Sequence, residues 1–115
     1  MNYNWIISGV DYLPQEAGFT KVIKIIHWRM EATQGELKVD DFGAFYLAPP
    51  TSHEFIAFSQ VDTPTIIEWL EKGFSKEDEL EAPKTMIQVL KEKLAYRMAE
   101  KVSANTLRQS SVSMA

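Results

Sequence analysis

The chain has 115 residues, of which 45% are hydrophobic and 24% charged, and its formal net charge is −4 at pH 7. This length and apolar content fit one globular domain with a modest core and exclude a wholly disordered chain. The chain contains no cysteine, which excludes a disulfide framework, a thiolate zinc site and a cysteine nucleophile.

The charged residues are unevenly divided along the chain. Residues 1–81 contain 14 acidic and 6 basic side chains, a net of −8, whereas residues 82–115 contain 2 acidic and 6 basic side chains, a net of +4. The acidic first part argues against nucleic-acid binding, because phosphate neutralisation leaves a basic footprint. The longest apolar clusters are far shorter than the roughly 20 residues that cross a membrane, so no membrane partner is expected.

The first half of the chain has the pattern of β-strands. Residues 3–10 are rich in aromatic and β-branched side chains and predict a strand, which a loop over residues 13–18 follows. Residues 20–33 alternate most clearly and predict a strand with one core face and one wet face. The predicted core face carries Ile26, Trp28, Met30 and Ala32, and the predicted wet face carries His27, Arg29 and Glu31.

A hairpin is predicted next. Gln34-Gly35 separates two strand-like runs, and glycine can adopt the positive φ that tight hairpin turns need. The return strand is predicted over residues 37–48, with Trp28 of the preceding strand facing the core. Asp40, Asp41 and Gly43 interrupt it, which indicates a bulge or an edge position, and the two aspartates should project to opposite faces.

The second half has the pattern of helices. Residues 51–61 are predicted to be an extended connection that holds Phe55, Ile56 and Phe58 on the core. Thr63 and Pro64 predict an N-cap and a first helical residue, with a short helix over residues 64–72 and Gly73 as its stop.

A long C-terminal helix is predicted to begin near Pro83 and to end near Ala104. Residues 75–78 resemble its capping signal. Its buried face should carry Met86, Ile87, Leu90, Leu94 and Met98. The sequence therefore predicts an α+β fold, an antiparallel meander of three or four strands packed against one short and one long C-terminal helix. It predicts a single domain over residues 1–104 and a polar tail over residues 105–115 that frays without a partner.

No residue pattern identifies a catalytic, cofactor-binding or metal site. His27 and His53 are the only histidines, and neither has a carboxylate or a second histidine at ligand spacing. Ser52, His53 and Glu54 are consecutive, so they cannot converge as a catalytic triad. We therefore expect no enzyme, no cofactor and no small-molecule substrate, with an enzyme built on unrecognised residues as the alternative.

Protein-binding residues are predicted on the long helix. Lys93, Arg97 and Lys101 lie at i, i+4 and i+8, which places them along one side of the helix. They form either a solvated face or a docking surface for an acidic neighbour, including the acidic part of another copy. The three tryptophans occupy apolar-patterned positions and are interpreted as core residues, with an interface role as the alternative.

Several strings resemble a group of small tailed-bacteriophage proteins of unassigned function. The similarity extends over about residues 3–95 and rests mainly on the strand that contains HWR at residues 27–29 and the helix that contains IIEWLE at residues 66–71. That group supplies no catalytic residues to transfer, and many of its members have a proline-rich tail that this chain lacks. The resemblance implies a phage origin and leaves the role open.

The leading hypothesis is a non-enzymatic bacteriophage protein that acts by protein–protein binding, as a virion structural or virion-accessory component. Its expected partners are other virion proteins or copies of itself, and its expected location is the virion or the host cytoplasm. The alternative is a small intracellular phage effector that binds and inhibits or redirects a host protein. A cryptic hydrolase or nuclease accessory subunit is a third hypothesis.

Overall fold

The computed structural model describes residues 1–51 and 55–114, and the side chains of residues 1–51 and 55–105. Three strands come first, β1 (Asn2–Glu16), β2 (Phe19–Gln34) and β3 (Leu37–Tyr46). A short 3₁₀ turn, η1 (Phe58–Gln60), precedes the helices α1 (Thr63–Phe74) and α2 (Met86–Met114). The α+β fold with one short and one long C-terminal helix is confirmed.

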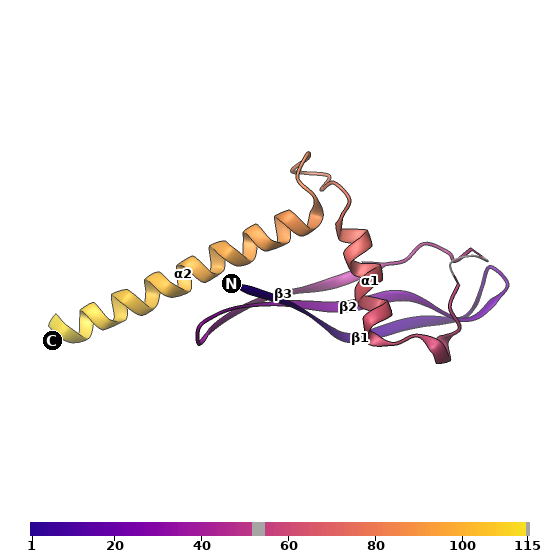
Figure 1. Cartoon of the computed structure of the whole chain (residues 1–115), viewed down its shortest axis with the longest axis horizontal. Helices are drawn as coiled ribbons and strands as arrows, with labels where there is room; N and C mark the ends of the chain where they lie inside the picture. The colour runs from indigo at the N-terminus through magenta and orange to yellow at the C-terminus, as the bar shows by residue number, and fades with distance from the viewer. Residues whose placement is uncertain (52–54, 115) are drawn as a thin grey trace.

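The strands form an antiparallel sheet in the order β1-β2-β3, so β2 is the central strand. Both helices lie on one side of this sheet, where α1 crosses the strands and α2 runs beside them (Figure 1). The backbone of α2 projects past the hairpin between β2 and β3, which gives the molecule a length of 68 Å against a thickness of 18 Å.

β2 has the predicted alternation. The exposed fraction of the residue surface is 7% for Trp28, 2% for Met30 and zero for Ile26 and Ala32. His27, Arg29 and Glu31 lie on the opposite face and are partly exposed. The predicted face of β2 is therefore the buried one. A shift of one residue would have turned His27, Arg29 and Glu31 into the core instead.

β1 differs from its prediction, because it continues to Glu16 through the segment 13–18 that was interpreted as a loop. Pro14 is tolerated there because β1 is an edge strand, where a missing N–H breaks no bond to a third strand. The turn is confined to Ala17 and Gly18, whose φ angles of 52° and 83° fit a two-residue type I′ hairpin loop.

The hairpin between β2 and β3 is confirmed, but its loop is shifted by one residue. Gln34 pairs with Leu37, so the loop consists of Gly35 and Glu36 and the positive φ of 59° lies at Gly35. β3 ends at Tyr46, before the predicted end at Ala48, and it is an edge strand with continuous register and no bulge against β2.

The bulges lie between β1 and β2. The register shifts between Ile7 and Gly9, and again between Asp11 and Tyr12. The second shift leaves Lys24 of β2 without an opposite residue on β1, and it reverses the phase of alternation, so that Ile23 and Ile26 are both buried. Lys24 forms an ion pair with Glu16 at 2.7 Å.

The core is formed by the buried face of β2 and one side of each helix. α1 contributes Ile66, Leu70 and Phe74, and the buried side of α2 is the predicted one, with Leu90, Leu94 and Met98 retaining at most 5% of their exposure. Phe74 packs edge-on against Trp5 and Trp28, with ring centroids 5.2 and 5.3 Å apart. Of the predicted connection residues, Phe58 packs on the core, Phe55 stacks on Phe19, and Ile56 is exposed.

α1 begins one residue earlier than predicted. Asp62, not Thr63, is the N-cap, and its carboxylate accepts hydrogen bonds from the hydroxyl and the backbone N–H of Thr65 at 2.5 and 3.0 Å. These hydrogen bonds lower the pKa of Asp62 below its usual value.

Gly73 lies inside α1 and does not end it, since the helix continues to Phe74. A Cβ at Gly73 would lie 2.1 Å from Cζ of Phe45. The glycine is therefore required by the close approach of α1 to β3.

We expect Gly73→Ala to destabilise the fold, although alanine is the better helix former by about 1 kcal/mol. Overpacking costs about 1–3 kcal/mol, and the clash is with an aromatic ring in the core. Urea denaturation of Gly73→Ala, Phe45→Ala and the double variant measures the coupling between the two sites. A stabilised Gly73→Ala variant, or additive effects in the double variant, would contradict the packing role of Gly73.

The loss of stability on replacement by alanine should differ between Trp28 and Trp69. Trp28→Ala should cost about 3–5 kcal/mol, because the ring is buried against Trp5 and Phe74. Trp69→Ala should cost less, since Trp69 is only partly buried at the margin of the core. Equal losses in urea melts of the two variants would show that both rings are equivalent core residues.

Candidate functional site

The predicted basic row of α2 is directed at β3 of the same chain. Nζ of Lys93 lies 3.3 Å from Oδ2 of Asp41, and a guanidinium nitrogen of Arg97 lies 3.3 Å from Oδ1 of Asp41. Arg97 also donates to the backbone oxygen of Asp40 at 2.5 Å, and Lys101 donates to the backbone oxygen of Lys38 at 2.6 Å. The acidic neighbour that the structure provides for the row is therefore Asp41.

These contacts cover part of the outer edge of β3. An edge strand leaves backbone carbonyls unpaired, and Arg97 and Lys101 donate to two of them. Asp41 faces the helices with 17% of its side chain exposed, whereas Asp40 lies on the other face with 51% exposed. The prediction that the two aspartates project to opposite faces is confirmed.

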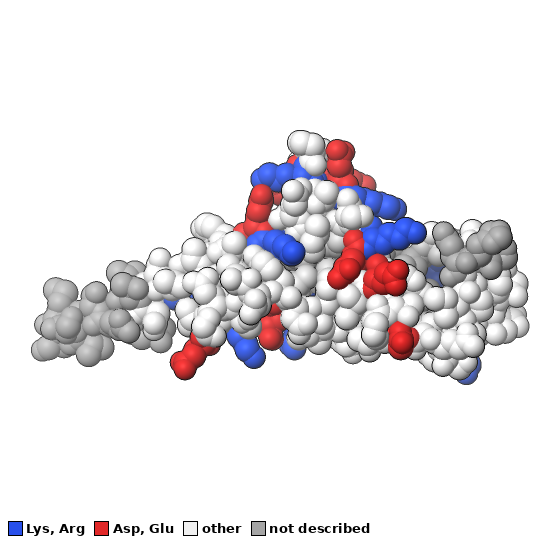
Figure 2. Space-filling view, viewed as in Figure 1, with Lys and Arg blue, Asp and Glu red and all other residues white. Residues whose placement is uncertain are grey.

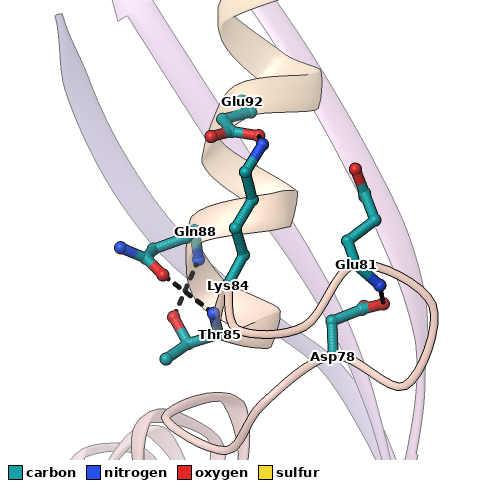
Figure 3. Close-up of polar contacts among 6 residues, drawn as sticks. All are labelled: Asp78, Glu81, Lys84, Thr85, Gln88 and Glu92. Atoms are coloured by element: carbon teal, nitrogen blue, oxygen red, sulfur yellow. Dashed lines mark hydrogen bonds and ion pairs between the residues drawn. The ribbon is translucent and has the colours of Figure 1, made fainter.

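The acidic segment of residues 77–81 lies between α1 and α2. On the face that Figure 2 shows, acidic and basic side chains gather together over this connection, so the division of charge along the sequence does not produce separate charged faces there. Asp78 accepts a hydrogen bond from the backbone N–H of Glu81 at 3.1 Å (Figure 3) and another from the backbone N–H of Leu80 at 2.9 Å. Asp78 thus stabilises a turn before α2, where the sequence had indicated a helix cap.

The cap of α2 is a reciprocal pair that the sequence analysis missed. Thr85 Oγ1 accepts from the backbone N–H of Gln88 at 3.3 Å, and Gln88 Oε1 accepts from the backbone N–H of Thr85 at 2.8 Å (Figure 3). This is the capping box, and its T-x-x-Q pattern was the available signal. Pro83 therefore lies before the helix, which begins at Met86 and continues past Ala104 to Met114. Beside the cap, the hydrogen bond of Lys84 to Glu92 raises the pKa of Lys84.

The second face of the sheet is not covered by either helix. We call this surface, formed by the outward residues of β2 and β3, the open face. Phe42 and Tyr46 of β3 lie on it with 77% and 73% of their surface exposed. Their partners on β2 are Arg29 and Ile25. The sequence placed both aromatics in a strand but did not predict their exposure. Phe42 and Tyr46 are even-numbered like Asp40, so in a regular strand they lie on the same face as Asp40 and on the face opposite to Asp41.

Polar groups of the open face lie beside these aromatics. His27 Nε2 and Asp11 Oδ2 are 2.8 Å apart, so strand pairing brings His27 the carboxylate that its own sequence neighbourhood lacks. Arg29 Nε lies 3.9 Å from Asp40 Oδ2, and this buried nitrogen has no hydrogen bond within the described residues. Arginine and aromatic side chains together are typical of the energetic centres of protein interfaces.

A hollow on the open face is lined by Ser8 and His27 among others. In the described residues no hydrogen bond joins Ser8 to His27, whose partner is Asp11. Within the same residues no cluster of three potential metal-ligating side chains occurs. His53 lies outside the described residues.

A cavity of about 400 Å³ opens between α1, the end of β3 and the segment that follows it. Most of its lining is apolar, and the two charged residues that border it are Lys72 and Lys76. The sequence analysis did not predict a cavity, because its walls come from parts of the chain that lie far apart in the sequence.

Residues 1–108 match the model of a family described as a domain of unknown function (DUF7936). The chain belongs to this family. No curated protein and no solved structure matches it. The matched residues include the whole sheet, α1 and most of α2, so the open face, the cavity and the helix-to-edge contacts all lie within the family domain. In the described part of the chain, neither helix has a stretch long and apolar enough to span a membrane.

The pairing of the basic row with Asp41 predicts an asymmetry between two adjacent aspartates. Asp41→Asn removes the partner of Lys93 and Arg97 and should lower the free energy of unfolding by about 1 kcal/mol, the upper range for exposed ion pairs. Asp40→Asn is the matched control and should change it by less than about 0.5 kcal/mol. Urea melts at low and high salt provide the measurement, and the difference should shrink with salt. Equal values for the two variants would show that the row does not hold α2 to β3.

Proposed function

We propose that the protein acts by binding other proteins and that the open face of the sheet is its contact surface. The observation that carries this proposal is the exposure of Phe42 and Tyr46 by 77% and 73% on one face of one edge strand. Large aromatic rings that remain exposed together on a folded domain are typical of interaction sites.

The neighbours of the rings support the same role. Arg29 lies opposite Phe42 on β2, and 43% of its side-chain surface is exposed. A partner that covers Phe42 would bury apolar area and contact the exposed part of the Arg29 side chain at the same time.

The proposed setting is a bacteriophage, with the protein as a virion structural or virion-accessory component. The similarity of the HWR and IIEWLE strings to small tailed-phage proteins supports the phage setting. Other virion proteins or further copies of this chain are the proposed partners. The alternative setting is the host cytoplasm, where the same face would bind a host protein.

The contact surface is tested by Phe42→Ser and Tyr46→Ser in infected cells that produce the tagged protein. Each change should reduce the amount of protein in purified virions more than about tenfold, the loss expected for a binding hot spot of about 2 kcal/mol. Mass spectrometry relative to the major capsid protein gives the measurement. Tyr96→Ser is the matched control, because Tyr96 is 67% exposed on α2, away from the open face.

The outcomes separate the hypotheses. Wild-type protein that is absent from virions contradicts the virion role and favours the intracellular effector. A photo-crosslinking residue at position 42 then identifies the host partner, and the same residue at position 96 should give no product. Virion content that is equal for Phe42→Ser, Tyr46→Ser and Tyr96→Ser would refute the open face as the contact surface.

A further inference from the structure

We propose that the cavity beside α1 binds a small apolar carboxylate, such as a fatty-acid chain of medium length. This proposal does not rest on the proposed protein-binding role, although Tyr46 of the open face also borders the cavity. The cavity volume of about 400 Å³ is within the range of small-ligand sites, whose walls are mostly apolar with a few polar groups that orient the ligand.

The apolar wall comes from β2 as well as from α1, the end of β3 and the segment that follows it. β2 and β3 contribute Val22, Ile23 and Phe45, α1 contributes Trp69, and the segment after β3 contributes Leu47 and Pro50. Such a wall takes up an alkyl or aryl group through the removal of apolar surface from water.

Two cations define the charge of the ligand. Lys72 and Lys76 line the cavity and are both exposed, and within the described residues neither ammonium group has an ion pair or a hydrogen bond to a carboxylate. By contrast, Lys24, Lys38, Lys84 and Lys93 each pair with a carboxylate of the chain. The lysines at the cavity are thus available to a carboxylate from outside.

An anion could bind in this cavity only with the help of the two lysines, because the cavity lies beside the C-terminal end of α1. Lys72 lies in the last turn of α1, and the carbonyl end of a helix carries partial negative charge. A carboxylate at this place would be repelled by the helix end unless the two ammonium groups outweigh it. Removal of both charges should therefore abolish the preference for an anion while the apolar wall remains.

Decanoate and decanol are the probes, because they share an apolar chain and differ in charge. Titration of the purified protein with monomeric decanoate should give a saturable change in tryptophan emission, because Trp69 lines the cavity. Trp69→Phe should lose this change, since Trp5 and Trp28 are not among the lining residues. Decanoate should bind at least about tenfold more tightly than decanol, a difference of about 1.4 kcal/mol.

The double variant Lys72→Gln/Lys76→Gln should reduce the affinity for decanoate to that for decanol and leave decanol binding unchanged. Lys84→Gln/Lys91→Gln removes the same charge at positions that do not line the cavity, and it should bind decanoate as the parent does. Phe42→Ser should also bind decanoate normally, which keeps this test independent of the protein-binding proposal.

Each other result overturns the proposal. A titration without saturation shows that the cavity takes no such ligand, and a signal that persists in Trp69→Phe places the ligand elsewhere. Equal affinities for decanoate and decanol, or an unchanged preference in Lys72→Gln/Lys76→Gln, refute carboxylate recognition by the two lysines.

Discussion

The burial of one face of β2 is the constraint on which the rest of this structure depends. Among the strands of the described residues, β2 alone has neighbours on both sides, and the helices pack on its Ile26, Trp28 and Met30. Because side chains of a strand alternate strictly, this burial directs His27 and Arg29 to the other side. The two-layer fold and the existence of an open face thus have one cause.

The attachment of α2 combines a second apolar surface with charge. Leu94 and Met98 are buried, and the basic residue just before each of them, Lys93 or Arg97, contacts Asp41. An apolar stripe alone permits a helix to slide or rotate slightly on a sheet. Cations that reach a fixed carboxylate at the strand edge restrict this freedom and cover carbonyls that would otherwise attract a foreign strand.

The sequence could predict what depends on neighbours in the chain. Alternation in β2, the glycine hairpin and the buried side of α2 are local patterns, and the structure has all of them. The sequence could not predict the partner of Lys93, because Asp41 lies 52 residues away and meets it only after the helix docks. The pairing of His27 with Asp11, and the cavity bordered by Lys72, depend in the same way on long-range packing.

Two local sequence signals led to wrong predictions, because tertiary packing gives the residue a different role from its usual one. Gly73 has the usual identity of a helix stop, yet its lack of a Cβ serves the contact with Phe45 inside α1. Pro14 normally breaks a strand, but β1 tolerates it at an edge. In both cases the residue type showed that the position was unusual. Only the neighbouring elements of the fold showed why a glycine or a proline is accommodated there.

The same close packing connects the core to the open face. Gly43 lies opposite Trp28, and a Cβ at this glycine would lie 2.8 Å from Cζ2 of the indole. The glycine therefore leaves the space that the indole of Trp28 occupies over β3. Phe42 directly precedes Gly43 in β3 and points the other way, so it lies on the open face while the other side of the strand packs on Trp28. The backbone that carries this exposed aromatic is thus held by the packing of the core beneath it.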